Sequence, residues 1–218
     1  MDDTARRDEL LTALTTEHFT LQGARSQTVN ESSSRGALYI GAVSSALVAL
    51  GFITQVPKVG DVFEVFALTV LPTLYLLGLF TFVRLVENSA EDFRYGLAIN
   101  RIRGYYQELA GEHAELFLLS GHDDRAGVLS NMGARPGSRQ QYFTFASTIA
   151  VINSVVGGSA AAIAAGAFGA TLAAATGIGA GAAIVSLVVL LRLQARLLGD
   201  HASQTRALFP SRRRASRQ

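Results

Sequence analysis

The chain has 218 residues, of which 49% are hydrophobic and 17% are charged, with a formal net charge of +2. Soluble proteins usually carry about 25% charged residues, so this composition points away from a soluble globular protein. Cysteine is absent, which excludes disulfides, thiolate catalysis and cysteine-ligated zinc or iron–sulfur sites.

The first segment, residues 1–35, is polar and precedes the first apolar run. Its larger side chains recur at helical spacing and predict an amphipathic helix; they are Leu10, Leu11, Leu14, His18 and Leu21. This helix either lies on a membrane surface or packs on the rest of the protein, and its mixture of acidic and basic residues favours packing. Ser32, Ser33 and Ser34 are expected to cap the start of the next helix, because short hydroxyl side chains accept from free backbone N–H groups.

Long apolar runs follow, and a membrane span needs about 20 such residues. No charged residue lies between Arg139 and Arg192, and this stretch is long enough for two spans. Backbone groups in lipid must bond within their own segment, so the runs are expected to be helices. The alternative, buried core helices of a soluble protein, is disfavoured because the runs lack the polar stripe of such helices. The predicted spans are residues 36–57, 65–83, 143–165 and 172–191, with outer turns at 58–64 and 166–171.

The predicted fold class is therefore an all-α polytopic membrane protein, with four transmembrane helices in two hairpins plus cytoplasmic helices. The chain has nineteen basic residues, and Lys58 is the only one in a predicted outer turn. Because basic residues stay in the cytoplasm, both termini and the middle segment, residues 84–142, are predicted to be cytoplasmic. The preference for arginine over lysine, together with abundant alanine and glycine, suggests a GC-rich bacterial genome.

The middle segment carries a heptad pattern of about three repeats. Its apolar seam is Tyr95, Ile99, Ile102, Tyr106, Leu109, His113 and Leu116, and a charged stripe beside it includes Arg94, Arg101, Glu108 and Glu115. Two interpretations stay open: the helix packs within its own chain, or it packs between subunits of a ring. In the second case, Tyr95, Ile99, Ile102, Tyr106, Leu109 and those four charged residues are the candidate contacts. Residues 121–137 are predicted to form a loop, and Ser138 to start the helix that leads into the third span.

Several glycines and one asparagine are candidates for close helix packing. Glycine costs about 1 kcal/mol against alanine within a helix, so Gly104 and Gly111 are expected either to permit a close approach or to mark a break. Gly177 and Gly181 have the spacing that lets membrane helices approach closely, whether within a hairpin or between subunits. Asn153 is expected to form an interhelical hydrogen bond, because an unpaired amide in lipid is costly; its alternative role is to line a pore.

Signals for chemistry are weak. His122, Asp123 and Asp124 are adjacent on a loop and lack the spacing of a metal site, so loop capping is expected and no metal or cofactor is predicted. No nucleophile motif or phosphate-binding loop is present, and no carboxylate lies within a span, which disfavours proton-coupled transport. The last segment, residues 192–218, is predicted to be a basic cytoplasmic tail, disordered from Pro210. Its Arg212, Arg213 and Arg214 are expected to attract anionic lipid head groups rather than nucleic acid.

Two stretches resemble a family of small bacterial inner-membrane proteins, the RipA-type octameric membrane proteins. These stretches are EHFTLQGARSQTVNESSSRGALYIGAVSSALVALGF, around the first span, and LGLFTFVRLVENSAEDFRYGLAINRIRGYY, which leaves the second. The resemblance covers roughly residues 17–106 and implies an octamer, but it brings no catalytic residues. The first half also resembles two-span pore-forming effectors of bacterial conflict systems, from which the chain departs by its second hairpin.

The sequence therefore predicts a non-enzymatic, homo-oligomeric protein of the bacterial inner membrane, with a structural or assembly role. Its expected partners are the lipid bilayer and other copies of the chain. The alternative is a channel or a pore-forming membrane effector. An enzyme is disfavoured because paired catalytic groups are missing.

Overall fold

The computed structural model describes residues 3–55, 60–133, 144–202 and 206–211, and these residues form helices and no strand. Four of the helices are long and apolar enough to cross a membrane, so the predicted all-α, polytopic fold class is confirmed. The elements in chain order are α1 (Asp3–Ile53), α2 (Gly60–Ala110), the 3-10 helix η1 (Gly111–Leu116), α3 (Arg125–Asn131), α4 (Phe145–Ala167) and α5 (Leu172–Ala202).

The chain divides into two compact units. The membrane unit contains Glu31–Glu87 and Phe143–Leu198, and therefore the four apolar runs. The extramembrane unit contains Met1–Asn30, Asn88–Tyr142 and Gly199–Gln218.

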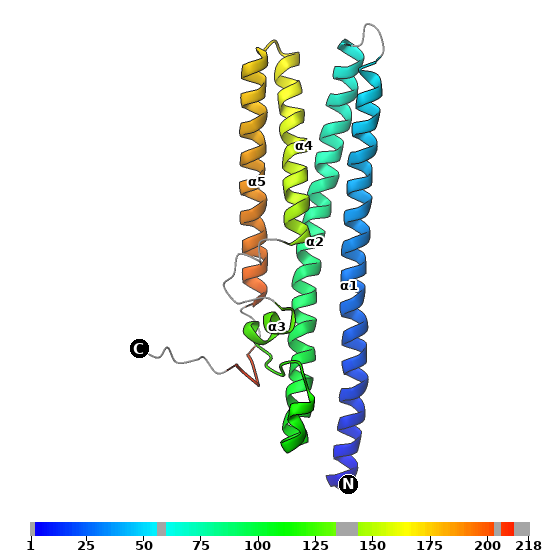
Figure 1. Cartoon of the computed structure of the whole chain (residues 1–218), viewed down its shortest axis with the longest axis vertical. Coiled ribbons are helices and arrows are strands. Elements are labelled where there is room, and N and C mark those ends of the chain that lie inside the picture. Colours follow the sequence, from blue (N-terminus) through cyan, green and yellow to red (C-terminus); the bar gives the residue numbers. More distant parts are fainter. Residues whose placement is uncertain (1–2, 56–59, 134–143, 203–205, 212–218) are drawn as a thin grey trace, which may run out of the picture. The chain divides into compact units, whose positions relative to one another are not determined.

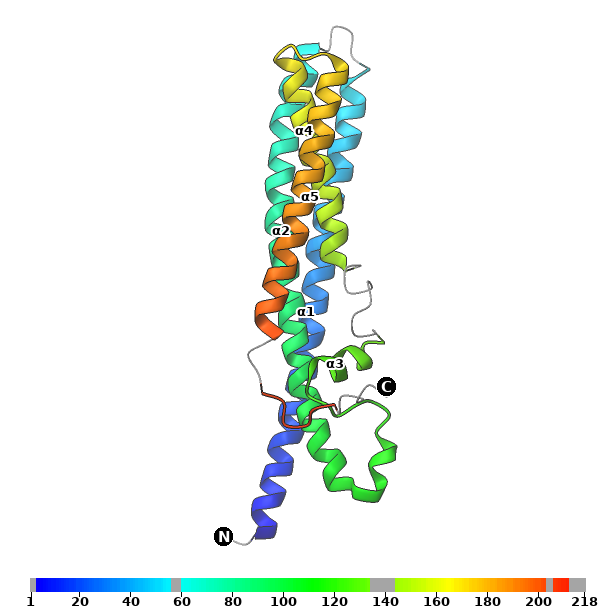
Figure 2. The ribbon, with the colours of Figure 1, turned by 90° about the vertical axis from the view of Figure 1, so that its left-hand side faces the viewer.

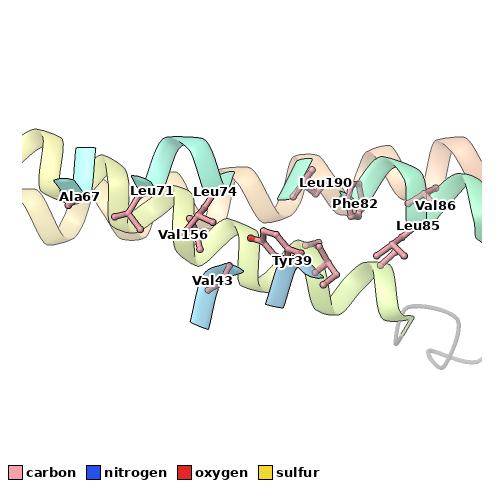
Figure 3. Close-up of a cluster of buried hydrophobic side chains, with 13 residues drawn as sticks. Tyr39, Val43, Ala67, Leu71, Leu74, Phe82, Leu85, Val86, Val156 and Leu190 are labelled. Atoms are coloured by element: carbon pink, nitrogen blue, oxygen red, sulfur yellow. The ribbon is translucent and has the colours of Figure 1, made fainter. Parts of the chain in front are cut away.

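The membrane unit is a bundle of two helical hairpins. Figures 1 and 2 show α4 and α5 side by side, joined by residues 168–171, and α1 beside α2. All four helices contribute to one apolar core, in which Tyr39 and Phe82 are the largest fully buried side chains. Figure 3 shows this core, with Tyr39 and Val43 from α1 facing residues of α2, Val156 of α4 and Leu190 of α5.

Two helices begin earlier in the chain than the predicted spans. Helix α1 runs without a break from Asp3 to Ile53, so Ser32, Ser33 and Ser34 cap no helix start; within a continuous helix the backbone N–H groups already bond to the preceding turn. Helix α2 begins at Gly60 and so includes residues 60–64 of the predicted outer turn. Backbone hydrogen bonding does not require apolar side chains, and a helix can therefore extend beyond the apolar run.

The predicted loop at 121–137 contains a short helix, α3, between Arg125 and Asn131. Asp124 caps it, since its Oδ1 accepts from the Gly127 N–H at 2.8 Å, and that cap stabilises a first turn that composition alone did not reveal. Ser138, the predicted start of the next helix, lies outside the described residues; α4 begins at Phe145 with Thr144 as its cap. Helix α5 continues past 191 to Ala202, so Arg192 and Arg196 belong to a helix and not to a tail.

The heptad pattern of the middle segment ends earlier than predicted. Helix α2 stops at Ala110, and Gly111 has a φ of +54°, a conformation that favours glycine. Residues 111–116 form a 3-10 helix, so His113 and Leu116 do not continue the seam of α2. In the extramembrane unit, α1 and α2 are joined by Arg25 and Asp92, whose Nε and Oδ1 lie 2.7 Å apart.

Candidate functional site

Gly158 of α4 and Gly179 of α5 mark a close approach of the two helices of the second hairpin. A Cβ on Gly158 would lie 2.6 Å from the Gly179 carbonyl oxygen, and a Cβ on Gly179 would lie 2.7 Å from the Gly158 carbonyl oxygen. Real Cβ atoms do not come so close to a backbone atom, so both positions need glycine. The predicted pair, Gly177 and Gly181, is exposed, and no atom of the described part of the chain lies within 4 Å of either Cβ position. Within the subunit, therefore, the predicted glycines do not pack the hairpin.

A polar pair is buried among the membrane helices. The Tyr39 hydroxyl of α1 donates to Oδ1 of Asn153 of α4 at 2.9 Å, and Asn153 is fully buried. Gly78 of α2 makes room for the pair, because a Cβ there would collide with the Asn153 amide. Among the described residues, the Asn153 Nδ2 has no hydrogen-bond partner. Asn153 thus forms an interhelical hydrogen bond. Because its side chain is buried in a single subunit, it lines no surface of that subunit.

A second polar contact joins three helices of the same bundle. The hydroxyls of Tyr75 of α2 and Ser186 of α5 lie 3.0 Å apart, and the Ser154 Oγ of α4 donates to Ser186 Oγ at 3.3 Å. Gly157 leaves space for the Tyr75 ring, which would otherwise lie 2.6 Å from a Cβ. Small residues and hydroxyl pairs of this kind hold membrane helices together where the apolar driving force is weak.

Substitution of Tyr39 by Phe is expected to destabilise the membrane unit by about 1 kcal/mol, because Asn153 then has no partner on either polar atom. The double substitution Tyr39→Phe, Asn153→Leu should recover most of this loss, since removal of both partners of a hydrogen bond is nearly neutral. Reversible unfolding in mixed micelles measures both variants. Equal destabilisation of the single and the double variant would contradict the pairing.

A charged cluster lies in the membrane unit just before the first span and just after the second. Arg84 Nε and Nη2 donate to Glu31 Oε1 and Oε2 at 2.9 and 3.2 Å, and Arg35 Nε donates to Glu31 Oε1 at 2.8 Å. Arg84 also contacts Glu87 at 3.3 Å. Glu31 therefore joins α1 to α2 through a forked contact, which is the strongest geometry for an arginine and a carboxylate.

The hydrogen bonds from Arg84 and Arg35 lower the pKa of Glu31 from 4.5 to about 2. A carboxylate whose pKa is lower in the folded state stabilises the fold above its unfolded pKa, and this contribution is lost as the pH falls through its folded pKa. We therefore expect the stability of the protein to fall between pH 4.5 and about pH 2 in part because of Glu31. The pH dependence of the unfolding midpoint should be shallower in Glu31→Gln over this interval, and an identical slope in both proteins would refute the assignment.

The residues predicted as oligomer contacts fall into two groups. Ile99 and Ile102 are 4% and 6% exposed within the extramembrane unit, so they pack within their own subunit; Tyr95 and Tyr106 are half-buried. Leu109 is 37% exposed. The exposed charged residues of the stripe are Arg94, Glu108 and Glu115.

Arg101 of the stripe has partners within its own chain. Its Nε donates to Oδ2 of Asp123 at 2.6 Å, and its Nη2 donates to the Arg206 carbonyl at 2.8 Å. The Asp123 side chain is fully buried. Burial alone would raise the Asp123 pKa, but the N–H groups of Leu208 and Phe209, together with Arg101, outweigh it and hold the pKa below its usual value. Arg101 therefore holds an internal carboxylate and is not free for another subunit.

The extramembrane unit also exposes large apolar side chains, and contact of apolar surface with water is unfavourable. Leu116 is 79% exposed and Leu118 is 95% exposed. Their neighbours Phe117 and Leu119 are 37% and 44% exposed. We call residues 116–119 the apolar cluster. Phe19 of α1 is 68% exposed in the same unit.

The remaining predictions concern the basic tail and metal binding. Arg212, Arg213 and Arg214 are outside the described residues. Among the residues that the structure describes, no group of three histidine or acidic side chains is placed to hold a metal ion. Sequence reasoning missed Tyr39, Gly78 and the contact of Glu31 with Arg84, and the only local signal was the spacing of Glu31 and Arg35, four residues apart on one helix face.

Comparison of the chain with protein-family models, with curated proteins and with solved structures gives no match. The resemblance to RipA-type proteins therefore stays a prediction, and the function must be argued from the residues and their geometry.

Proposed function

We propose that the protein is a homo-oligomeric membrane protein with a structural or assembly role, whose copies meet through the extramembrane unit. The observation that carries this proposal is the apolar cluster, where Leu116 and Leu118 are almost fully exposed in a single copy. Large exposed apolar side chains grouped on a soluble surface are typical of protein–protein contacts. A second copy of the same chain is the simplest partner, because most oligomers of soluble segments are symmetric and self-complementary.

Charged residues of the same unit fit this proposal. Arg94 and Glu108 are exposed on α2, so a basic and an acidic residue of the stripe are available for contacts between copies, and Glu115 is exposed on η1, beyond the end of α2. Charge complementarity of this kind selects the correct partner and register more than it adds affinity. Arg101 is excluded from this set because it bonds to Asp123 of its own chain.

In the membrane unit, Gly177 and Gly181 of α5 are exposed and unpartnered within the subunit. Small residues four apart allow a second membrane helix to approach closely. We propose that this face of α5 also contacts another copy. The number of copies that the RipA-type resemblance implies is eight.

We further propose that the membrane is a bacterial inner membrane and that both termini are cytoplasmic. The support is the arginine distribution, since Lys58 is the only basic residue in either predicted outer turn and basic residues are retained on the cytoplasmic side. A non-catalytic role is supported by the lack of a nucleophile or phosphate-binding motif in the sequence.

Charge reversal tests the contact between copies. Arg94→Glu and Glu108→Arg are each expected to reduce the oligomeric fraction in detergent, because a like-charge contact opposes assembly. The double variant should restore part of it if the two residues face each other across subunits. Matched reversal at Arg7, an exposed residue of α1 outside the stripe, should have no effect. Unchanged size in both single variants would count against the stripe as a contact.

A channel is the second candidate, because hydroxyl side chains are exposed in the predicted spans. Ser44 and Ser45 of α1 and Thr69 and Thr73 of α2 are exposed in a single copy, whereas Asn153 is buried. In an oligomer, the serines or threonines would have to face a central pathway. Ion flux through liposomes that contain the purified protein tests this alternative, and its absence in correctly assembled protein would exclude a constitutive channel.

A further inference from the structure

The segment that follows α5, residues 206–211, is held by the loop that precedes α3. Asp123 accepts two main-chain hydrogen bonds from it: Oδ2 from the Leu208 N–H at 3.0 Å and Oδ1 from the Phe209 N–H at 2.7 Å. Asp124 Oδ2 accepts from the Ser211 N–H at 2.6 Å and also from the Ser211 hydroxyl. Two adjacent carboxylates thus bind three main-chain donors of one short segment.

In further contacts the segment is the acceptor, through its main-chain carbonyl groups. The Asp123 N–H donates to the Phe209 carbonyl at 3.3 Å, and the Arg206 carbonyl accepts from Arg101 at 2.8 Å. His122 Nδ1 lies 3.3 Å from the Phe209 carbonyl. Main-chain pairing of this kind is how peptide-recognition surfaces bind a linear segment, while side-chain pockets add specificity.

The side-chain contact is made by Phe209. A Cβ on Gly104 of α2 would lie 2.7 Å from the Phe209 ring and 2.7 Å from the Gly121 carbonyl oxygen. Gly104 therefore leaves the space that the phenyl ring and the loop occupy. A cavity of about 420 Å³ opens at the same place, lined by residues of α2, of the loop and of residues 208–210.

The sequence of residues 206–211 suits the two carboxylates that accept its main-chain hydrogen bonds. The carboxylates use the main-chain N–H groups of Leu208, Phe209 and Ser211. The skipped position is Pro210, which has no N–H to leave unpaired. Proline also fixes its own φ, so less conformational entropy is lost when the segment is bound.

We propose that His122, Asp123, Asp124 and Gly104 form a peptide-binding site, and that its occupant is residues 206–211 of the same chain. The chemical class of the ligand is a short peptide with an aromatic residue followed by proline and a hydroxyl residue. With residues 206–211 in place, Asp123 is buried, and a buried carboxylate is stable only with partners, which the segment supplies together with Arg101. This inference does not depend on the oligomeric state.

The absence of cysteine allows a direct test in the full-length chain. Glu108 and Leu208 line the same cavity, and neither side chain takes part in the hydrogen bonds that hold residues 206–211. In Glu108→Cys, Leu208→Cys, a short bifunctional thiol reagent should link the two positions within one chain, which denaturing electrophoresis detects as a compact monomer. An excess of the free peptide Arg-Ala-Leu-Phe-Pro-Ser should reduce the yield, whereas the same peptide with alanine in place of phenylalanine should not.

Asp123→Asn in this background should lower the yield by about tenfold or more, because the amide NH₂ then faces one of the two main-chain donors and the charge-assisted bonds are lost. Glu112→Gln, an exposed carboxylate of η1 outside the site, is the matched control. Crosslinks found only at the dimer mass would overturn the assignment of the occupant to the same chain. A yield that neither Asp123→Asn nor the peptide changes would overturn the site itself.

Discussion

Gly179→Leu is expected to destabilise the second hairpin by about 3 kcal/mol or more, because the side chain would collide with the backbone of α4. The position that Cβ would take is 2.7 Å from the Gly158 carbonyl and 2.7 Å from Ala162 Cβ. A backbone atom of a packed helix cannot move aside as a side-chain end can. Thermal or denaturant unfolding in detergent measures the loss.

Gly181→Leu is the matched control, since it introduces the same side chain on the same helix, two residues away. Gly181 has no atom within 4 Å of its Cβ position, so the fold of a single copy should be unaffected. The proposed contact between copies predicts instead that Gly181→Leu weakens assembly, because leucine keeps the helix of another copy at a greater distance. Equal unfolding behaviour of the two variants would show that Gly158 and Gly179 do not form the close contact.

Leu118→Glu is expected to break the proposed oligomer while the subunit stays folded. Leu118 is 95% exposed in a single copy, so the substitution removes no packing within the subunit. A buried anchor of an interface contributes about 2 kcal/mol or more, which corresponds to roughly a thirtyfold change in an association constant. Light scattering after size-exclusion chromatography, repeated over a range of protein concentrations, measures the change in mass.

Thr16→Glu is the control for this variant, because it adds the same charge at an exposed position of α1 in the same unit. It should leave the mass of the particle unchanged. Far-UV circular dichroism should show the helical content of both variants to be that of the original protein. If Leu118→Glu keeps its full mass under all conditions, the apolar cluster is not the contact between copies.

The four apolar helices could be predicted from the sequence alone. A long run without charge is a local property of the chain, and few structures other than membrane helices accommodate it. For Gly104 and Gly111 the sequence left two roles open, and the structure assigns one to each: Gly104 permits a close approach of Gly121 and Phe209, and Gly111 ends α2. Only the second follows from the properties of glycine in a single helix. Ser32, Ser33 and Ser34 were misjudged, because a helix that continues through polar residues into an apolar run leaves no local signal of its continuity.

The contacts across helices could not be predicted in the same way. Tyr39 and Asn153 are 114 residues apart in the chain, and Asp123 and Phe209 are 86 apart. Which glycine packs a hairpin depends on how α5 is rotated against α4, so Gly179 could not be distinguished from Gly177 and Gly181 by spacing. Asp123 and Asp124 were expected to cap a loop, and Asp124 does cap α3, but their binding of residues 206–211 depends on tertiary structure.

The central claim is that several copies of this chain assemble in the membrane, and the mass of the full-length protein in detergent or in a lipid nanodisc tests it most directly. The proposal predicts a single species whose protein mass is a multiple of 23.1 kDa, with eight copies if the RipA-type resemblance is correct. Particle images of the same sample should show a closed ring. A stable, folded species of 23.1 kDa at all concentrations would contradict the claim.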